Sequence, residues 1–282
     1  MSKIALVTDS TSYIPKELVE RYKITVAPQV VIWGGKIYED GLDIQPQEFY
    51  ERLKTATVMP STSQATVASF EKIFRRLLDD GNEILAILIS EKLSGTINSA
   101  VQARELFPGA TIEIVDSKSV AMALGFQVLT VARALEAGAN LAECVKLANK
   151  ATNYTGVIFA VDTLEFLHRG GRIGGGKRFL GTALKIKPLM ELRDGKIEAL
   201  EQVRTRNKSL LRLVEILVER TAGKSPVRLA TLHANAYEDA KEILALANAR
   251  VQSVENVFSE VSPAVGTHAG PGTVGLAYMA GM

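Results

Sequence analysis

The chain has 282 residues, of which 47% are hydrophobic, and this composition excludes an intrinsically disordered protein. Lysine and arginine together number 33 against 31 for aspartate and glutamate, so no global basic field favours nucleic acid as a partner. The strongly apolar run at residues 119–132 has 14 residues and is shorter than the ~20 that span a bilayer. The length predicts about two domains.

The first half of the chain alternates β-rich runs with helical patterns. They lie in turn at 3–10, 15–22, 83–90, 94–106, 110–117 and 119–137. The strand runs are continuously apolar, which is typical of parallel strands covered by helices on both faces. We therefore predict an α/β fold whose N-terminal domain, residues 1–153, is doubly wound around a mostly parallel sheet.

Residues 27–41 (APQVVIWGGKIYEDG) have a different pattern. Gly34 and Gly35 separate two β-prone runs, as the two central residues of a tight hairpin turn do. We predict a small hairpin segment, at about residues 27–62, inserted into the N-terminal domain.

From residue 154 onwards the pattern changes. Strands are predicted at 156–162, 227–233 and 256–261, a strand pair within 188–203, and helices at 209–222 and 237–249. The pair flanks Asp194-Gly195, a two-residue turn that requires antiparallel pairing. The sequence therefore predicts a C-terminal mixed α/β domain with antiparallel strands over residues 154–282.

Cys144 is the only cysteine, so no disulfide can form within the chain. It lies in the amphipathic stretch 141–150, where a free thiol ordinarily packs as a small core residue. The first residues resemble a strand and lack the charged, apolar and cleavage regions of a secretory signal. These features predict a soluble protein in a reducing, cytoplasmic compartment.

Hydroxyl-rich stretches border several predicted strands of the first half. They are TDSTS at 8–12, PSTSQ at 60–64, SEKLSGT at 90–96 and VDSKS at 115–119. Ligands bind at strand ends in open α/β sheets, and hydroxyls with helix N-terminal amides suit a small anionic head group without a metal. Each stretch taken alone is more typical of a helix N-cap, and it is the occurrence of four in one half of the chain that favours a shared polar pocket.

The segment GTHAGPGTVG, residues 266–275, lies close to the chain end. Its Gly270, Gly272 and Gly275 match the GxGxxG pattern of a dinucleotide-binding turn, but too few residues follow for the helix and strand that this unit needs. We interpret the segment as a constrained loop whose function depends on partner segments elsewhere in the chain.

His268 is one of three histidines, and it lies beside Thr267 in this segment. A histidine before a glycine-proline turn is placed to hydrogen-bond a ligand, while a packed histidine without a function is the alternative. His168, His233 and Cys144 provide no metal-ligand spacing with it. We therefore predict no metal site.

LHRGGRIGGGKR at 167–178 contains the GxxxxGK pattern, but Arg178 stands where a P-loop needs Ser or Thr for magnesium. This departure argues against an ATP site. Two interpretations remain, a basic loop that faces a phosphate or a partner protein, and a solvated glycine loop. VRTRNKS at 203–209 adds Arg204 and Arg206 at a strand end, where alternating charges either bind a partner or face water.

Eight motifs occur in the order and spacing of the DegV family, which the sequence resembles from Lys3 to the C-terminus. They are TDSTS at 8–12, PSTSQ at 60–64, SGT at 94–96, VDS at 115–117, GGRI at 170–173, IKPLM at 186–190, RTR at 204–206 and GTHAGPGT at 266–273. Each motif is moderately specific, and their shared register carries the resemblance.

The resemblance implies a bacterial fatty-acid-binding protein, the lipid-carrying subunit of fatty acid kinase. In that family a long acyl chain lies in the apolar interior of the N-terminal domain, with its carboxylate at the domain junction. A separate kinase subunit brings ATP and phosphorylates the carboxylate, yielding acyl phosphate for phospholipid synthesis. The carrier is then no enzyme and needs no cofactor or nucleic acid, and it contacts the membrane transiently for lipid exchange.

The resemblance also assigns residues. Contacts to the carboxylate would be Thr62, Ser94, Thr267 and His268. Beside them would lie Ser61, Ser63, Gly95 and Arg172, the last near the reacting group. Arg204 and Arg206 would belong to the kinase-docking surface. The family often has serine after GGRI, where this chain has Gly174, so a hydroxyl contact at that position is lost.

Two other functions remain open from the residues themselves. A free-standing phosphotransferase or hydrolase would use His268 as a general base and the glycine loop for phosphate, but the altered P-loop argues against it. A regulatory module that senses a small anion would share the polar site and would need no long apolar tunnel.

Overall fold

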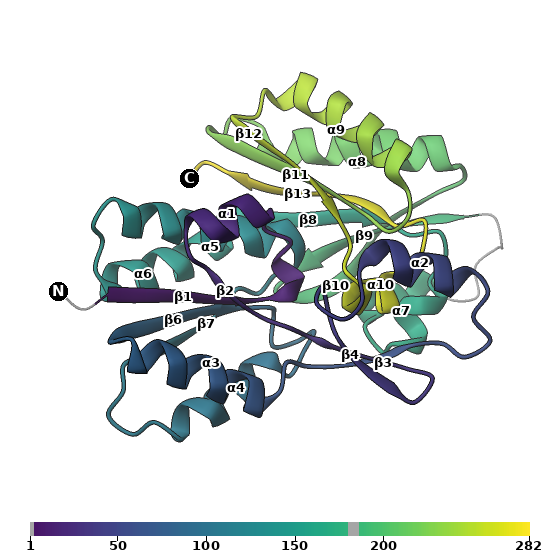
Figure 1. Cartoon of the computed structure of the whole chain (residues 1–282). Coiled ribbons are helices and arrows are strands. Elements are labelled where there is room, and N and C mark those ends of the chain that lie inside the picture. Colours follow the sequence, from purple (N-terminus) through teal and green to yellow (C-terminus); the bar gives the residue numbers. More distant parts are fainter. Residues whose placement is uncertain (1–2, 180–185) are drawn as a thin grey trace.

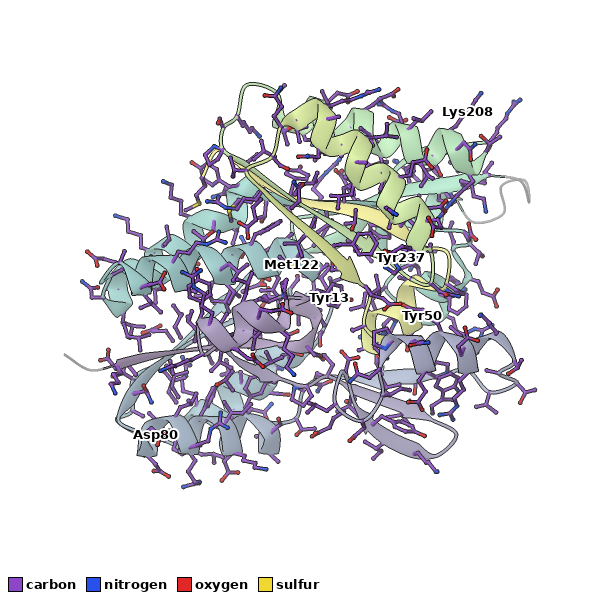
Figure 2. All side chains as sticks on the ribbon, turned by 45° about the horizontal axis from the view of Figure 1, so that its top comes forward. Tyr13, Tyr50, Asp80, Met122, Lys208 and Tyr237 are labelled. Carbon is purple, nitrogen blue, oxygen red and sulfur yellow. The ribbon has the colours of Figure 1, made fainter. Side chains whose placement is uncertain are left out.

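The computed structural model describes residues 3–179 and 186–282. Its elements stack in layers in the order helix, sheet, helix, sheet, helix, with a small inserted subdomain at one side (Figure 1). Side chains follow this layering, since Met122 and Tyr13 lie in the interior while Asp80 and Lys208 project from opposite outer surfaces (Figure 2). Within the described ranges, no helix combines the length and the apolar composition needed to cross a membrane.

The N-terminal sheet is four-stranded and parallel, in the order β2-β1-β6-β7. Its strands are β1 (Lys3–Asp9), β2 (Thr25–Ala27), β6 (Asn82–Leu88) and β7 (Ile112–Asp116). On one face pack α3 (Val67–Asp79) and α4 (Thr96–Glu105), and on the other lie α1 (Lys16–Arg21), α5 (Ala121–Glu136) and α6 (Leu141–Ala151). This confirms the doubly wound parallel arrangement predicted from the continuously apolar strand runs.

The C-terminal sheet is six-stranded, in the order β10-β9-β8-β13-β11-β12. Its strands are β8 (Thr155–Ala160), β9 (Lys187–Arg193), β10 (Lys196–Val203), β11 (Val227–His233), β12 (Glu255–Glu260) and β13 (Val274–Ala280). All neighbours pair antiparallel except β11 and β12, which are joined by α9 (Tyr237–Val251). With α8 (Arg206–Thr221), α9 covers the outer face, so the predicted mixed α/β class is confirmed.

Helix α5 is the middle layer and packs against both sheets. Its residues from Ala121 to Leu129 are buried in succession, so the first part of the helix is enclosed on every side. A helix of this kind needs burial on every side, which two flanking sheets provide. The largest core cluster therefore runs from one sheet to the other through α5. The predicted domain boundary between residues 153 and 154 would leave each sheet intact. It would assign α5, which both sheets share, to the N-terminal domain.

The inserted subdomain contains β3 (Val30–Trp33), β4 (Lys36–Glu39), α2 (Pro46–Lys54) and β5 (Ser61–Ser63). The predicted hairpin is present, because Gly34 and Gly35 have φ angles of 59° and 78° that favour glycine in a two-residue turn. Strand β5 adds a third strand. The Tyr50 hydroxyl donates to the Val261 carbonyl oxygen at 3.0 Å, so the subdomain also contacts the C-terminal part.

The prediction that residues 266–275 form a loop is wrong at both ends. Gly266 to Ala269 close the short helix α10 (Pro263–Ala269), and β13 begins at Val274. The buried Asp40 carboxylate accepts a hydrogen bond from the Ala264 amide at 3.0 Å and so caps this helix from a distant part of the chain. Such a cap leaves no local sequence signal.

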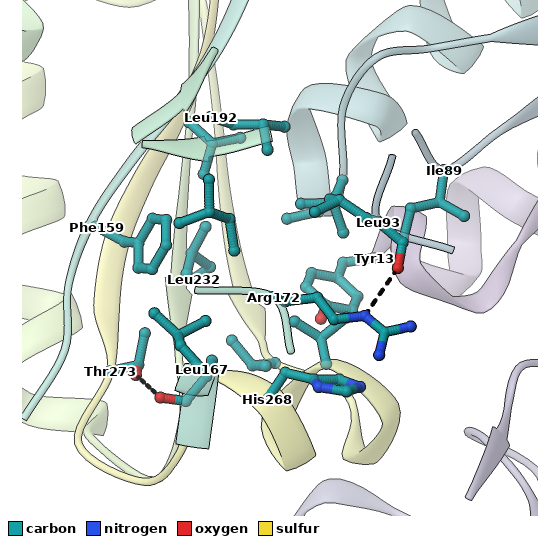
Figure 3. Close-up of a pocket in the computed structure, with 17 residues that line it drawn as sticks. Tyr13, Ile89, Leu93, Phe159, Leu167, Arg172, Leu192, Leu232, His268 and Thr273 are labelled. Carbon is teal, nitrogen blue, oxygen red and sulfur yellow. Dashed lines mark hydrogen bonds between the residues drawn. The ribbon is translucent and has the colours of Figure 1, made fainter. Parts of the chain in front are cut away.

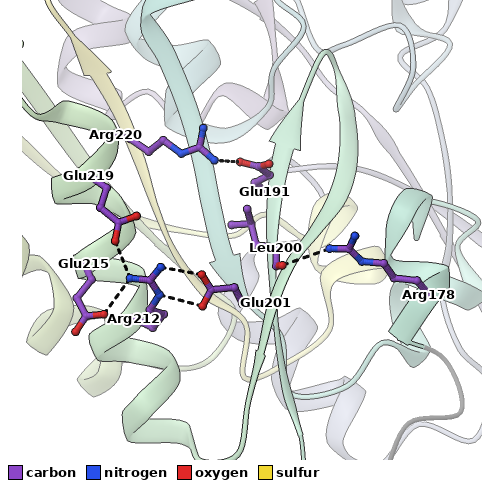
Figure 4. A network of polar contacts seen from close by, with 8 residues as sticks. All are labelled: Arg178, Glu191, Leu200, Glu201, Arg212, Glu215, Glu219 and Arg220. Atoms are coloured by element: carbon purple, nitrogen blue, oxygen red, sulfur yellow. Dashed lines mark hydrogen bonds and ion pairs between the residues drawn. The ribbon is translucent and has the colours of Figure 1, made fainter.

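The glycine-rich segment does not form a P-loop. It follows α7 (Glu165–Arg169) instead of a strand, and residues 174–179 form the 3₁₀ helix η3 (Gly174–Phe179) against β10. The Arg178 guanidinium donates to backbone carbonyls of β10, including that of Leu200 (Figure 4). A Cβ at Gly175 would collide with the Glu198 carboxylate, so this glycine packs closely against an acidic side chain of β10.

Ion pairs tie the β9–β10 hairpin to α8. The Arg212 guanidinium contacts three carboxylates, those of Glu201 on β10 and of Glu215 and Glu219 on its own helix (Figure 4). The buried Glu191 carboxylate on β9 pairs with Arg220 at 2.9 Å. These contacts fix the hairpin from outside, and its inner side chains line the cavity described next.

Candidate functional site

A narrow apolar cavity, here the apolar slot, lies at the seam between the N-terminal and C-terminal parts (Figure 3). It contains about 700 Å³ of empty space, its open mouth included, of which only about 90 Å³ is wide enough for the centre of a water molecule. The N-terminal part contributes Tyr13, Ile89, Leu93, Val120 and Ala121. All other lining residues come from the C-terminal part. The width suits a thin, unbranched apolar chain.

The position of the slot differs from the expectation drawn from the family resemblance. That expectation placed an acyl chain inside the N-terminal domain, whereas the slot lies between the domains. The shared layer accounts for this position, because α5 packs between the two sheets and the slot lies at its N-terminal end, beside Val120 and Ala121. Strands of the C-terminal sheet supply the opposite wall, for example through Phe159 and Leu232.

Polar side chains of the slot gather at one end. Arg172 is the only charged residue among the described residues that line it, and His268 lies next to it (Figure 3). Both residues also line two further cavities. One is a wide open pocket that includes Thr62 and Thr267, and the other is a small hydroxyl pocket that includes Thr62 and Ser94. Arg172 and His268 therefore lie at the junction of the apolar slot with the two polar pockets.

Thr62 and His268 are brought together from opposite parts of the chain. The Thr62 hydroxyl and His268 Nε2 share a hydrogen bond of 2.6 Å. Thr62 pairs with Val31 in the inserted sheet and points to the same inner side, while His268 lies in the last turn of α10. A Cβ at Gly170 would lie 2.0 Å from His268 Nδ1, so only glycine lets the imidazole ring occupy this position.

The His268 ring is neutral at physiological pH. Burial, together with the nearby Arg172 guanidinium, lowers the pKa of the imidazole to about 4. His268 Nδ1 is buried without a hydrogen-bond partner in the described structure. The ring is thus a neutral hydrogen-bonding group, and the positive charge at this end of the slot belongs to Arg172.

Arg172 bridges the seam. Its Nε donates to the Leu93 carbonyl oxygen at 3.0 Å on the N-terminal side, and Nη1 donates to the Gly170 carbonyl oxygen at 2.7 Å. Nη2 has no protein partner within residues 3–179 and 186–282. The guanidinium is held in place by two carbonyls and keeps a donor for an anion, a geometry that suits a carboxylate.

The family model described as "Uncharacterised protein, DegV family" matches residues 3–281. This chain belongs to the DegV family. A DegV domain-containing protein of Streptomyces coelicolor is 38% identical over 275 residues, which cover 97% of each chain. Among solved structures, a DegV family protein of Thermus thermophilus described by its fatty acid binding matches with a TM-score of 0.93 and 32% identity, covering 99% of both chains.

DegV of Bacillus subtilis, described as a fatty acid binding protein, gives a TM-score of 0.90 at 31% identity over 99% of this chain and 100% of that one. The resemblance inferred from eight motifs is therefore confirmed along nearly the whole chain. These likenesses also support the two-sheet architecture.

Ser94 and Ser63 of this DegV chain line the hydroxyl pocket together with Thr62, Arg172 and His268. The Ser94 hydroxyl shares a hydrogen bond of 2.8 Å with the Thr96 hydroxyl, which in turn bonds the buried Gln29 amide. Gly95 lines none of the three cavities and lies against Gln64 at the start of α4. The pocket hydroxyls thus belong to a connected network.

Thr267 and Ser61 lie outside this network. The Thr267 hydroxyl donates to the Pro263 carbonyl oxygen at 2.9 Å within its own helix, and its side chain lines only the open pocket. Ser61 is exposed and also borders the open pocket. These two residues are placed to contact something in the open pocket, while Thr62 and Ser94 are closer to the slot.

Asp40 is a structural contributor that the sequence analysis missed. One carboxylate oxygen accepts from the Ala264 amide at the start of α10, and the other accepts from the Ser10 hydroxyl at 2.6 Å. Burial raises the pKa of this carboxyl to about 6. Asp40 therefore joins the inserted subdomain, the N-terminal part and α10, and it positions the helix that carries His268. The pair Asp40-Gly41 marks the end of a predicted strand but does not indicate a contact with a distant helix.

The two arginines of the RTR motif have different surroundings. Arg204 is exposed. The Arg206 guanidinium is half-buried, with Nη2 at 2.7 Å from an Asp239 carboxylate oxygen and Nη1 at 3.5 Å from one of Asp162. Only Arg204 is freely available for a partner. No group of three potential metal-ligating side chains occurs in the part of the chain that the structure describes.

Proposed function

We propose that this protein binds a long-chain fatty acid, with the tail in the apolar slot and the carboxylate at Arg172 and His268. The observation that carries the proposal is the position of Arg172, the one charged residue among the described lining of a narrow apolar cavity. A fatty acid has the same distribution of chemistry, a single charge at the end of a thin chain. The solved DegV relatives described as fatty acid binding support it.

The free energies of burying the acyl chain and the carboxylate support separate roles for the slot and its polar end. A sixteen-carbon chain that leaves water gains roughly 0.8 kcal/mol per methylene, about 12 kcal/mol before the costs of association. A buried carboxylate without a partner costs several kcal/mol. The free Nη2 donor of Arg172, with the hydroxyls of Thr62 and Ser94, offsets that cost. Affinity therefore comes from the slot and orientation from the polar end.

The open pocket supports a second part of the proposal, presentation of the carboxylate to a separate ATP-dependent kinase subunit in the cytoplasm. This pocket meets the slot at Arg172 and His268 and has about 370 Å³ wide enough for the centre of a water molecule. A carboxylate oxygen would attack the γ-phosphorus of ATP brought by the kinase, ADP would leave, and acyl phosphate for phospholipid synthesis would form. The carrier orients the acid, is no enzyme itself, and exchanges it with membranes by transient contact.

Arg204 is the residue we propose for kinase docking, with Arg206 in support. Arg204 is exposed near the start of α8, whereas Arg206 is held by Asp239 and Asp162. Arg204 and the anchored Arg206 together present a positively charged surface. Such a surface speeds association with a partner that has an acidic surface.

The proposal is tested by denaturing the purified protein and analysing the organic extract by mass spectrometry. We expect fatty acids with fourteen to eighteen carbons in near-stoichiometric amount. The matched variant Arg172→Leu keeps an apolar stem and removes the charge, and it should retain far less acid. A co-purified nucleotide would favour a free-standing phosphotransferase, and a small anion without lipid would favour a sensor. Either of these results would reject the fatty acid carrier.

A further inference from the structure

A further cavity, distinct from the open pocket and the hydroxyl pocket, lies behind the slot, and we call it the distal pocket. Its lining is mainly polar and includes Lys118, Ser119, Asn153, Thr155 and Asp194. Val157 and Leu192 line both this pocket and the apolar slot. These two side chains therefore form the wall between the two cavities, here called the distal wall.

The distal wall stands at the far end of the slot from the charge. Strands β8 and β9 pair Ile158 with Glu191, and this register places Val157 beside Leu192 at the end of the ladder. Leu192 lies at the opposite end of the drawn cavity from His268 (Figure 3). A fatty acid with its carboxylate at the polar end would point its methyl group at this wall.

Hydrogen bonds across the seam hold the wall in place. The Ser90 hydroxyl donates to the Gly195 carbonyl oxygen at 2.9 Å, and Lys92 Nζ donates to the Asp194 carbonyl oxygen at 2.9 Å. Both acceptors belong to the β9–β10 turn, which starts two residues after Leu192. The strand that carries Leu192 is thus anchored to the N-terminal part, and the wall cannot slide along the slot without breaking these bonds.

Chemistry changes abruptly at the wall. Each methylene placed in the slot leaves water for apolar surroundings, a gain of roughly 0.8 kcal/mol. Beyond Leu192 the next groups are the polar side chains of Lys118, Thr155 and Asp194, against which a methylene gains little. The binding free energy gained with each added methylene therefore ends once the chain reaches the distal wall.

We propose that Leu192, backed by Val157, sets the longest acyl chain that the protein accepts. This proposal rests on the proposed fatty acid function and adds a chain-length determinant to it. Leu192 is a specificity residue, since it faces the terminal methyl end and lies far from the carboxylate.

The test is a set of binding titrations with saturated acids of twelve to twenty carbons. Leu192→Ala removes three carbons from the wall and should admit about two more methylenes. Each methylene contributes roughly fourfold in affinity, so in this variant the acid two carbons longer than the wild-type optimum should bind roughly fifteenfold more tightly than that optimal acid. Leu192→Phe adds volume to the wall and should shift the optimum to shorter acids.

Leu189→Ala is the matched control. Leu189 is on the same strand and fully buried, but it packs in the outer core cluster and lines neither cavity. This variant loses the same atoms as Leu192→Ala and should keep the wild-type order of affinities. Thermal unfolding of all variants identifies those that are folded. Only the affinities of these folded variants are compared.

A fatty acid with a hydroxyl on its last carbon tests whether Leu192 blocks access to the distal pocket or only contributes to packing. In the wild type the hydroxyl is pressed against Leu192 and should weaken binding at least tenfold relative to the parent acid. In Leu192→Ala the hydroxyl reaches the distal pocket, so most of this penalty should disappear. Loss of packing alone would not produce this rescue.

The outcomes are distinct. A shift in preferred length with either folded Leu192 variant, absent in Leu189→Ala, supports the proposal. An unchanged order of chain lengths in folded variants that still bind fatty acids overturns it and leaves the carrier function standing. A wild-type protein that binds none of the acids overturns the carrier function itself, and the chain-length proposal with it.

Discussion

The two sides of the seam contribute different chemistry to the slot. The C-terminal side supplies the cation of Arg172, the ring of His268 and most of the apolar lining. The N-terminal side supplies the hydroxyls of Thr62 and Ser94 and the Leu93 carbonyl that holds the Arg172 guanidinium. The C-terminal side thus provides the positive charge and most of the slot's apolar lining, and the N-terminal side provides the groups that orient a carboxylate. Neither part alone contains a complete site.

The largest expected effect separates charge from orientation. Arg172→Leu should weaken fatty acid binding at least a hundredfold, because it leaves the buried carboxylate without its cationic partner. The double variant Thr62→Ala with Ser94→Ala removes only neutral hydrogen bonds and should cost roughly ten- to thirtyfold. Both values come from calorimetric titration. Equal losses in the two variants would show that the sides of the seam do not differ in this way.

The pH dependence of stability sharpens the role of His268. Its pKa is about 4 in the folded protein, against 6.5 for an ordinary histidine. Between these values the unfolded state binds more protons, so stability is fully present above pH 6.5 and falls as the pH is lowered towards 4. The change is about 3 kcal/mol. His268→Gln should remove it in urea unfolding, and an unaltered pH profile would place the ring in a more solvated environment.

Asp40 should show the opposite sign, because its folded pKa of about 6 lies above the ordinary 3.8. Here the folded state binds more protons between these values, so stability falls as the pH rises from about 4 to 6. Asp40→Asn keeps the acceptor for the Ala264 amide and should abolish this slope, with a change of roughly 1 kcal/mol or less at pH 5. A slope that survives in Asp40→Asn would assign it to another carboxyl.

The smallest effect on lipid binding is expected at the RTR motif, because Arg204 and Arg206 line none of the cavities described above. Arg204→Ala should impair acyl phosphate formation by a cognate kinase while the lipid content of the carrier stays within twofold of wild type. Arg206→Ala breaks the pairs with Asp239 and Asp162 and should also lower stability slightly. If Arg204→Ala reduced lipid content as strongly as phosphorylation, its assignment to docking would be wrong.

Much of the architecture follows from local sequence. The apolar runs of β1 and β6 and the Gly34-Gly35 turn carry their own signals, because burial on both faces and left-handed turn geometry each select particular residues. Helix α10 has only a partial signal, since Pro263 at its start and Gly270 at its end fit a helix, but its side-chain cap is Asp40, 224 residues away from Ala264. Its seven residues resemble a glycine-rich loop until that long-range bond is known.

The candidate site was predictable only in part. Thr62, Ser94 and His268 lie in recognisable motifs, and the structure places all three around one pocket. Thr267 lies in the same motif as His268, but the helical turn directs its hydroxyl to the Pro263 carbonyl. The distal wall residue Leu192 has no motif, because its role depends on how two sheets meet. Interdomain packing of this kind is not encoded in the spacing of any single segment.

The central claim is that a fatty acid lies in the seam with its carboxylate at Arg172 and its methyl end at Leu192. A crystal structure with a sixteen-carbon acid that carries bromine on its last carbon tests it most directly, because anomalous scattering locates the bromine independently of the protein density. We predict one bromine site against Leu192 and Val157, with the carboxylate density at the Arg172 guanidinium. A bromine site within the core of the N-terminal domain, or at Arg172 itself, would contradict the claim.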